Sequence, residues 1–173
     1  GRKNSREKRL LKLYENIKDG RNWETEIKNA SSSGKLNSKK LYLYYLQMGK
    51  DAYTGNDIDI EDLFKDNRYD IDHIYPRSKI KDDSLTNKVL VNKTVNNNKT
   101  NVYPIDAAIQ SKMSPYWQML RSSGLISEET YKRLTRKTPL TDDELSAFVS
   151  RQLTETQQST KAVAHILEQL YPK

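Results

Sequence analysis

The first stretch of the chain has the spacing of an amphipathic helix. Apolar Leu10, Leu13 and Ile17 recur every three to four positions within residues 5–18, and Gly20 follows as a stop signal. Because side chains at this spacing share one face of a helix, residues 5–18 are predicted to pack one side against a core.

Two further helices are expected before residue 50. A short one is predicted around Trp23 and Ile27, and a longer one over residues 38–48, which are rich in Leu and Tyr and are followed by Gly49. Between them, residues 31–34 have the sequence Ser-Ser-Ser-Gly, which predicts a flexible link.

The middle of the chain changes from helical to alternating spacing. Residues 69–74 alternate polar and apolar side chains, which predicts a short strand that Pro76 ends. Residues 88–91 predict a second short strand, and the polar, Asn-rich residues 94–100 predict a short helix after it. A strand, a loop, a strand and a helix are therefore expected in succession.

The remainder of the chain is expected to be helical. Pro104 and Pro115 each suit the first turn of a helix, and Ser127 suits the start of another. Thr141 and Glu144 form a capping box before a further helix. The fold class is therefore predicted to be α+β and mainly α-helical, with helices around a small two-stranded centre.

The net charge of the chain indicates a class of binding partner. The 173 residues include 30 Lys and Arg against 23 Asp and Glu, so the formal net charge is +7. This balance suits a polyanionic partner, because cations that contact phosphates release counterions. The basic residues 1–20 have two interpretations, a helix that contacts nucleic acid or a solvated linker helix to another domain. We adopt the linker as the working hypothesis.

Composition also limits the chemistry. Cysteine is absent, which excludes a disulfide partner and thiolate ligands, so any metal ion would take oxygen or nitrogen ligands. No apolar run is long enough to predict a membrane span. The chain opens with Gly1 rather than Met, in a highly charged stretch, and we therefore expect a piece of a larger protein.

Two histidines are the candidates for acid–base chemistry. His165 falls among apolar residues of the expected C-terminal helix, and we interpret it as a packing or surface residue. His73 follows Asp72, and on a strand Asp70 and Asp72 share one face while His73 takes the other. By itself, such an Asp-His pair is more often a hydrogen-bonded strand histidine than a catalytic one.

Downstream asparagines change that interpretation. Asn87 precedes the second strand, and Asn96 lies in the polar stretch after it. Two strands backed by a helix can bring Asp72, His73 and Asn96 around one point. Carboxylate and amide oxygens suit Mg²⁺, which keeps several waters, and imidazole suits a general base. Phosphodiester hydrolysis requires both a cation on the phosphoryl oxygens and a group that activates the attacking water.

Several blocks of the sequence resemble one protein family in that family's order. Residues 72–76 with Asn87 and Asn96 resemble the ββα-metal motif of HNH nucleases. The similarity continues in Tyr-Leu-Tyr-Tyr-Leu-Gln at 42–47 and Arg-Gln-Leu-Thr-Glu-Thr at 151–156. It spans nearly the whole chain, which resembles the HNH domain of type II CRISPR RNA-guided DNA endonucleases.

The resemblance implies a role for each matching residue. Asp72 and Asn96 are implied as metal ligands and His73 as the general base, so these three form the implied catalytic set. Asn87 is implied to hold the loop and strands together. Asp70 is a weaker candidate that supports the strand.

The resemblance also implies a reaction and a setting. The reaction is hydrolysis of DNA with Mg²⁺, for which Mn²⁺ can substitute, in the strand paired to guide RNA. Residues 1–173 are implied to be one HNH domain of a larger prokaryotic, cytoplasmic antiviral effector. Within it, residues 51–103 would form the ββα-metal core and residues 104–173 the helical part. Lys99 can approach the scissile phosphate, with a plain surface lysine as the alternative.

Two alternative functions remain at this point. One is a non-catalytic nucleic-acid-binding or allosteric module that keeps the HNH motif as a scaffold, against which the intact Asp72, His73 and Asn96 argue. The other is a standalone HNH nuclease, which predicts strong DNA cutting by this chain alone. We expect weak activity of the isolated chain instead, because it lacks a guide-binding region.

Overall fold

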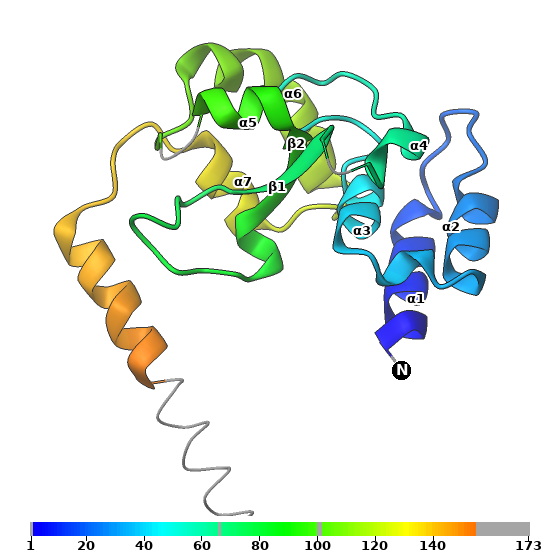
Figure 1. Cartoon of the computed structure of the whole chain (residues 1–173), viewed down its shortest axis with the longest axis horizontal. Helices are drawn as coiled ribbons and strands as arrows, with labels where there is room; N and C mark the ends of the chain where they lie inside the picture. The colour runs from blue at the N-terminus through cyan, green and yellow to red at the C-terminus, as the bar shows by residue number, and fades with distance from the viewer. Residues whose placement is uncertain (1, 66, 100–101, 155–173) are drawn as a thin grey trace, which may run out of the picture.

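Helices surround a two-stranded antiparallel sheet in the computed structural model, which describes residues 2–65, 67–99 and 102–154 (Figure 1). The elements are α1 (Arg2–Tyr14), α2 (Trp23–Ser32), η1 (Lys35–Asn37), α3 (Lys39–Leu46), α4 (Ile60–Leu63), β1 (Tyr69–His73), η2 (Leu85–Asn87), β2 (Lys88–Asn92), α5 (Lys93–Lys99), α6 (Ala107–Ser122) and α7 (Glu128–Thr135). A further helix begins at residue 142 and is described to residue 154. The predicted α+β, mainly helical class is confirmed.

The β hairpin joins two hydrophobic cores. Strand β2 places Leu90 in a core shared with side chains of α1, α2 and α3. Its neighbours Val89 and Val91 belong to a second core, which includes Tyr53 and Trp117. Successive side chains of a strand point to opposite faces, so one short strand contributes to both cores. The hairpin is thereby fixed from both sides.

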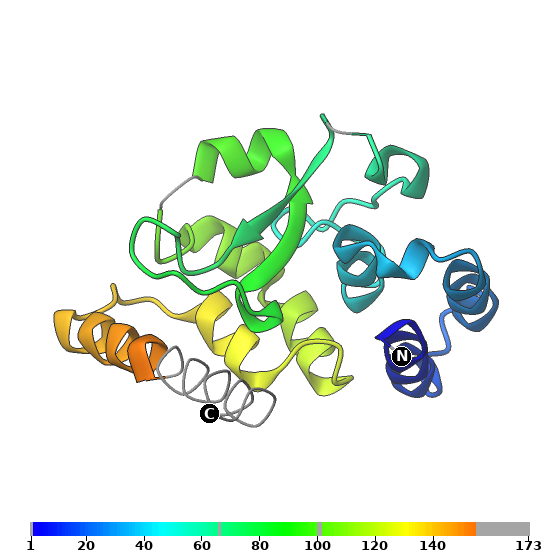
Figure 2. The same cartoon turned by 60° about the horizontal axis from the view of Figure 1, so that its bottom comes forward.

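The helices that flank the hairpin come from the second half of the chain. Figures 1 and 2 both place α5 on one side of the hairpin and α7 on the other. Helix α6 is fixed beside them by Trp117, whose indole N–H donates to the carbonyl of Ala52 at 2.9 Å. This hydrogen bond crosses from α6 to the segment that precedes the hairpin.

Capping residues set several of the helix boundaries. The Asn22 side chain accepts a hydrogen bond from Thr25 N at the start of α2, and the Ser127 hydroxyl accepts one from Thr130 N at the start of α7. The predicted capping box is confirmed, because the Thr141 and Glu144 side chains each accept a hydrogen bond from the other's backbone N–H.

Two local predictions were wrong. Residues 31–34 are not a flexible link throughout, because Ser31 and Ser32 form the last turn of α2. Ser31 is buried and its hydroxyl donates to Glu7 Oε2 at 2.7 Å, a partner on α1 that local composition does not reveal. Pro115 does not open a helix but lies inside α6, where buried Met113 and Trp117 anchor the chain on either side of it.

Other boundaries shifted. Helix α1 ends at Tyr14, earlier than predicted, and α6 begins at Ala107, three positions after Pro104, with Asp106 as its cap. His165 lies outside the described residues. Within the part of the chain that is described, no helix has both the length and the apolar content needed to cross a membrane.

Candidate active site

Asp72 is a buried carboxylate on β1. It is 9% exposed, and its Oδ2 accepts a hydrogen bond from the Tyr53 hydroxyl at 2.6 Å. Burial, together with the nearby charge of Asp72, raises the pKa of Tyr53 well above its ordinary value. Tyr53 therefore stays protonated at neutral pH and remains a donor to this carboxylate. No pattern in the sequence indicated this role for Tyr53, because it lies in a turn that precedes the motif residues.

His73 is held in a charged cluster at the end of β1. Its Nε2 lies 2.9 Å from Asp83 Oδ1, and the same oxygen accepts from Arg77 Nη2 at 2.9 Å. Hydrogen bonds from His73 and Arg77 lower the pKa of the Asp83 carboxyl to about 2. Arg77 Nε also lies 3.3 Å from His73 Nε2.

The ionised partner favours one tautomer of His73. A carboxylate only accepts hydrogen bonds, so the 2.9 Å contact with Asp83 requires the ring proton on Nε2. The longer contact from Arg77 would require the opposite tautomer, and the shorter charge-assisted bond outweighs it. In neutral His73, Nδ1 is then the nitrogen that can accept a proton.

Asn96 lies beside β1. Its Nδ2 donates to Asp70 Oδ2 at 3.4 Å, a long and therefore weak hydrogen bond. Asp70 and Asp72 occupy alternate positions of β1 and share a strand face, so this contact brings Asn96 toward the face that carries Asp72. Lys99 ends α5, but its side chain is not among those described.

Asn87 fastens the loop between the two strands. It is fully buried, and its Oδ1 accepts from Tyr75 N at 2.9 Å. Its Nδ2 donates to the carbonyls of Tyr75 at 3.2 Å and Asp82 at 3.0 Å. One side chain therefore ties the start of the loop to its end.

Arg133 is a buried residue at this loop that the sequence did not indicate. It comes from α7 and is 7% exposed. Its Nη1 donates to Asp82 Oδ2 at 2.6 Å and to Asn87 Oδ1 at 3.0 Å. These partners are far from Arg133 in sequence, and only the packing of α7 brings the residues together.

The donor set near β1 fits a hard cation that needs few protein ligands. Among the described residues, no group of three or more His, Cys, Asp or Glu side chains converges as a metal site. A site built from Asp72 and Asn96 therefore offers one carboxylate and one amide oxygen. This set suits Mg²⁺, which retains waters and takes substrate phosphate oxygens as further ligands. The hydrogen bond from Tyr53 gives Asp72 the kind of support that metal-binding carboxylates have.

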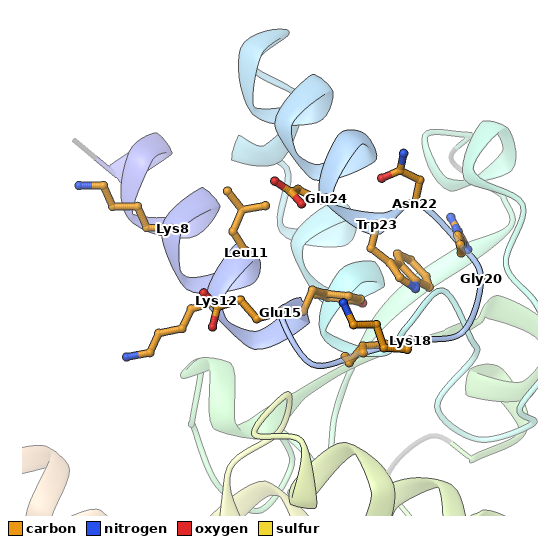
Figure 3. A pocket seen from close by; sticks show the side chains of 12 residues that line it. Lys8, Leu11, Lys12, Glu15, Lys18, Gly20, Asn22, Trp23 and Glu24 are labelled. Atoms are coloured by element: carbon orange, nitrogen blue, oxygen red, sulfur yellow. The ribbon is translucent and has the colours of Figure 1, made fainter.

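A large hollow of the described surface lies elsewhere. It has a volume of about 860 Å³ and lies between α1 and α2. Figure 3 shows Lys8, Lys12 and Glu15 at its edge, with Trp23 and Glu24 across from them. Its lining mixes both charges and includes none of the hairpin residues, so its size does not make it the candidate active site.

Comparison with known proteins places the chain in a family. The family model described as HNH endonuclease matches residues 51–105, which contain the hairpin, α5 and every site residue described above except Arg133. The chain belongs to the HNH endonuclease family. It is 39% identical to the CRISPR-associated endonuclease Cas9 of Streptococcus mutans, over 99% of this chain. The similarity predicted from sequence blocks is confirmed.

Two other relatives carry the same name. The protein from Listeria innocua is 43% identical over 79% of the chain, and that from Campylobacter jejuni is 46% identical over 42% of it. The chain spans only 12% of the S. mutans protein and 10% of the L. innocua protein. It therefore corresponds to one region of much longer relatives.

Proposed function

We propose that this chain is a catalytic domain of an RNA-guided endonuclease and hydrolyses phosphodiester bonds in the DNA strand paired to guide RNA. One observation carries the proposal: neighbouring residues of β1 supply a buried carboxylate, Asp72, and an imidazole with a fixed partner, His73. The names of the relatives support the setting, since proteins called CRISPR-associated endonuclease match nearly the whole chain. The net charge of +7 supports a nucleic-acid substrate.

Asp72 and Asn96 are proposed to hold Mg²⁺, with Mn²⁺ able to replace it. The support is the chemistry of the donors and the hydrogen bond by which Tyr53 orients Asp72. When bound, the ion would neutralise charge on the phosphoryl oxygens and on the departing oxygen. Asp70 is proposed to hold Asn96, through the contact between their side chains. The proposed phosphate contact of Lys99 rests on sequence position alone.

His73 is proposed as the general base. Its Nδ1 would accept a proton from the attacking water, and the negative charge of Asp83 would stabilise the imidazolium that forms. Attack in line would leave 5′-phosphate and 3′-hydroxyl ends. A positioned base of this kind contributes on the order of 10²–10⁴-fold in rate. Asn87 would keep the loop that carries Asp83 in place.

The partners are proposed from the relatives' length. We propose that this domain, residues 1–173, works inside a longer protein whose other regions bind the guide RNA–DNA heteroduplex. Residues 1–20 would serve as the basic connection, residues 51–103 as the ββα-metal core and residues 104–173 as the helical part.

A strand-specific cleavage assay tests the proposal. The full-length protein is assembled with guide RNA and given target DNA labelled differently on its two strands. His73→Ala and Asp72→Ala are expected to slow cutting of the paired strand at least about 100-fold, and chelation of divalent ions is expected to stop it. Asp57→Asn, which removes an exposed ion pair with Lys50, is the matched control.

The opposite results have a clear meaning. Cutting of the paired strand by His73→Ala at the wild-type rate would refute the proposed catalytic role and support a non-catalytic module instead. Guide-independent cutting by the 173-residue chain alone would support a standalone nuclease.

A further inference from the structure

We propose that Arg133 is a positioning residue for catalysis: from α7 it holds the hairpin loop, defined as residues 74–87, in the geometry that orients His73. The inference rests on the proposed function for its activity readout. Arg133 lies outside the residues matched by the family model, so the motif does not include it.

The surroundings of Arg133 are those of a buried cation with several partners. Besides Asp82 and Asn87, Arg133 Nε donates to Glu129 Oε1 at 3.1 Å. The guanidinium carbon lies 4.3 Å from the centroid of the Tyr75 ring. Three acceptors and one aromatic face thus surround a single side chain, and three of these four partners, Tyr75, Asp82 and Asn87, belong to the hairpin loop.

Two short routes connect Arg133 to His73. In the first, Asn87 Oδ1 accepts from both Arg133 Nη1 and the backbone N–H of Tyr75, two residues after His73. In the second, Arg133 binds the side chain of Asp82, whose neighbour Asp83 receives the His73 hydrogen bond. Arg133 therefore bonds directly to the neighbour of Asp83, and through Asn87 it is connected to Tyr75, two residues after His73.

The ion pair between Arg133 and Asp82 is hard to replace because both charged side chains are buried. The Arg133 and Asp82 side chains are 8% and 10% exposed. Burial raises the pKa of the Asp82 carboxyl, but hydrogen bonds from Ser84 and Arg133 outweigh that effect and hold the pKa below its ordinary value. Removing the cation would leave a buried carboxylate without its ion-pair partner, and the loop would have to move to hydrate it.

Anchoring of α7 does not need the guanidinium. The Tyr103 hydroxyl donates to the backbone carbonyl of Arg133 at 2.8 Å, and Gln110 Nε2 donates to the carbonyl of Leu134 at 3.1 Å. The Thr130 hydroxyl separately donates to the carbonyl of Thr86 at 2.8 Å. Because other residues attach the helix, the Arg133 side chain is available to organise the loop.

An arginine suits this position better than a lysine. The planar guanidinium has five N–H donors in a fixed fork and can also stack on an aromatic ring. It can therefore reach Asp82, Asn87 and Glu129 while covering Tyr75. A lysine ammonium could keep the charge but not all of these directions.

The test separates positioning from general stability. Arg133→Gln and Arg133→Lys are compared with wild type in the full-length protein with guide RNA, by single-turnover cutting of the paired strand over a range of DNA concentrations. Gln110→Met is the matched control, because it removes side-chain hydrogen bonds to α7 without touching the loop. Melting temperature and hydrogen exchange of the Tyr75 amide are measured for each variant.

We expect Arg133→Gln to lower the maximal rate about 10- to 100-fold, as a small misplacement of catalytic groups does. The DNA concentration at half-maximal rate stays nearly unchanged, and the Tyr75 amide loses protection. Arg133→Lys recovers part of the rate because it keeps the cation. Gln110→Met lowers the melting temperature but keeps both the rate and the protection of Tyr75.

Several outcomes would overturn the inference. These are a wild-type rate in Arg133→Gln, an unchanged Tyr75 exchange rate, or an equal rate loss in Gln110→Met. Failure of the proposed function is recognised separately, because His73→Ala would then cut normally, whereas the Tyr75 exchange readout needs no cleavage.

Discussion

The hydroxyl of Tyr53 donates a hydrogen bond to Oδ2 of Asp72 at 2.6 Å, and both side chains are buried. Tyr53 lies before the hairpin in the chain, with α4 between them, and it belongs to the second hydrophobic core. This contact therefore attaches the proposed metal ligand to that core. The orientation of Asp72 therefore depends on packing as well as on its place on β1.

Tyr53→Phe should weaken metal binding while the fold remains. A hydrogen bond to a charged group contributes on the order of 1.5–3 kcal/mol, and loss of such support costs about 10- to 100-fold in metal affinity or activity. The Mg²⁺ concentration for half-maximal cutting should rise accordingly. Tyr14→Phe removes another buried hydroxyl, which donates to the Tyr45 carbonyl, and it should leave this concentration unchanged. Equal Mg²⁺ dependence in both variants would contradict the role of Tyr53.

Two substitutions of Asp83 should lower the cutting rate by different amounts. In Asp83→Asn the amide can donate to His73 Nε2, which favours the tautomer with its proton on Nδ1 and blocks the proposed base. Asp83→Ala removes the partner without imposing a tautomer. We expect cutting to fall about 10-fold or more in Asp83→Asn and less in Asp83→Ala, measured as single-turnover rates. The reverse order would argue against Nδ1 as the proton acceptor.

The pH dependence of the two variants and wild type gives a related check. Hydrogen bonds from His73 and Arg77 lower the pKa of Asp83 to about 2, so its charge is present above that pH and is lost only below it. Between pH 5 and 9 the Asp83 carboxylate stays ionised, and the wild-type rate profile should show no step from this group. A step that disappears in Asp83→Ala would contradict this assignment.

Asn87→Ala should destabilise the chain strongly. The side chain is fully buried and takes part in hydrogen bonds with Tyr75, Asp82 and Arg133. Each buried partner left unsatisfied costs on the order of 1–3 kcal/mol, so we expect a loss of about 3 kcal/mol or more in urea unfolding. Asn29→Ala, at an exposed position of α2, should change the free energy of unfolding by less than about 0.5 kcal/mol.

Alkaline pH should reveal the buried Tyr53. Its folded-state pKa is raised by burial, so its contribution to stability is complete below the unfolded value near 10 and declines as the pH rises above it. The free energy of unfolding of wild type should therefore fall toward that of Tyr53→Phe by about 1.4 kcal/mol per pH unit above pH 10. If the free energy of unfolding falls equally with pH in the two proteins, Tyr53 ionises as easily in the folded chain as in the unfolded chain, which would contradict this prediction.

Much of the local structure was predictable because its causes are local. Alternation over residues 69–74 predicted β1, and the reciprocal Thr141 and Glu144 hydrogen bonds formed as the capping box required. Errors arose where distant residues decide. Ser31 is part of α2, where Glu7 of α1 accepts a hydrogen bond from its hydroxyl. Pro115 is helical because it lies between two buried side chains of α6.

The candidate site divides in the same way. Asp72, His73, Asn87 and Asn96 could be named from their order and from the resemblance of the sequence blocks, and their roles remain proposals. Their partners Tyr53 and Arg133 could not be named, because no spacing rule connects a turn tyrosine or a helical arginine to the motif. The contacts between them appear only after the hairpin, Tyr53 and α7 pack together in the second core.

By itself, the sequence determined the chemistry available at the hairpin: a carboxylate, an imidazole and two amides at fixed positions along the chain, with Lys and Arg in excess. Those properties reside in residue types and their order. Only the tertiary structure decided that Tyr53 donates to Asp72, that Asp83 faces Nε2 of His73, and that α7 holds the loop. Directional hydrogen bonds depend on where distant segments meet, and burial of both faces of β2 sets that meeting point.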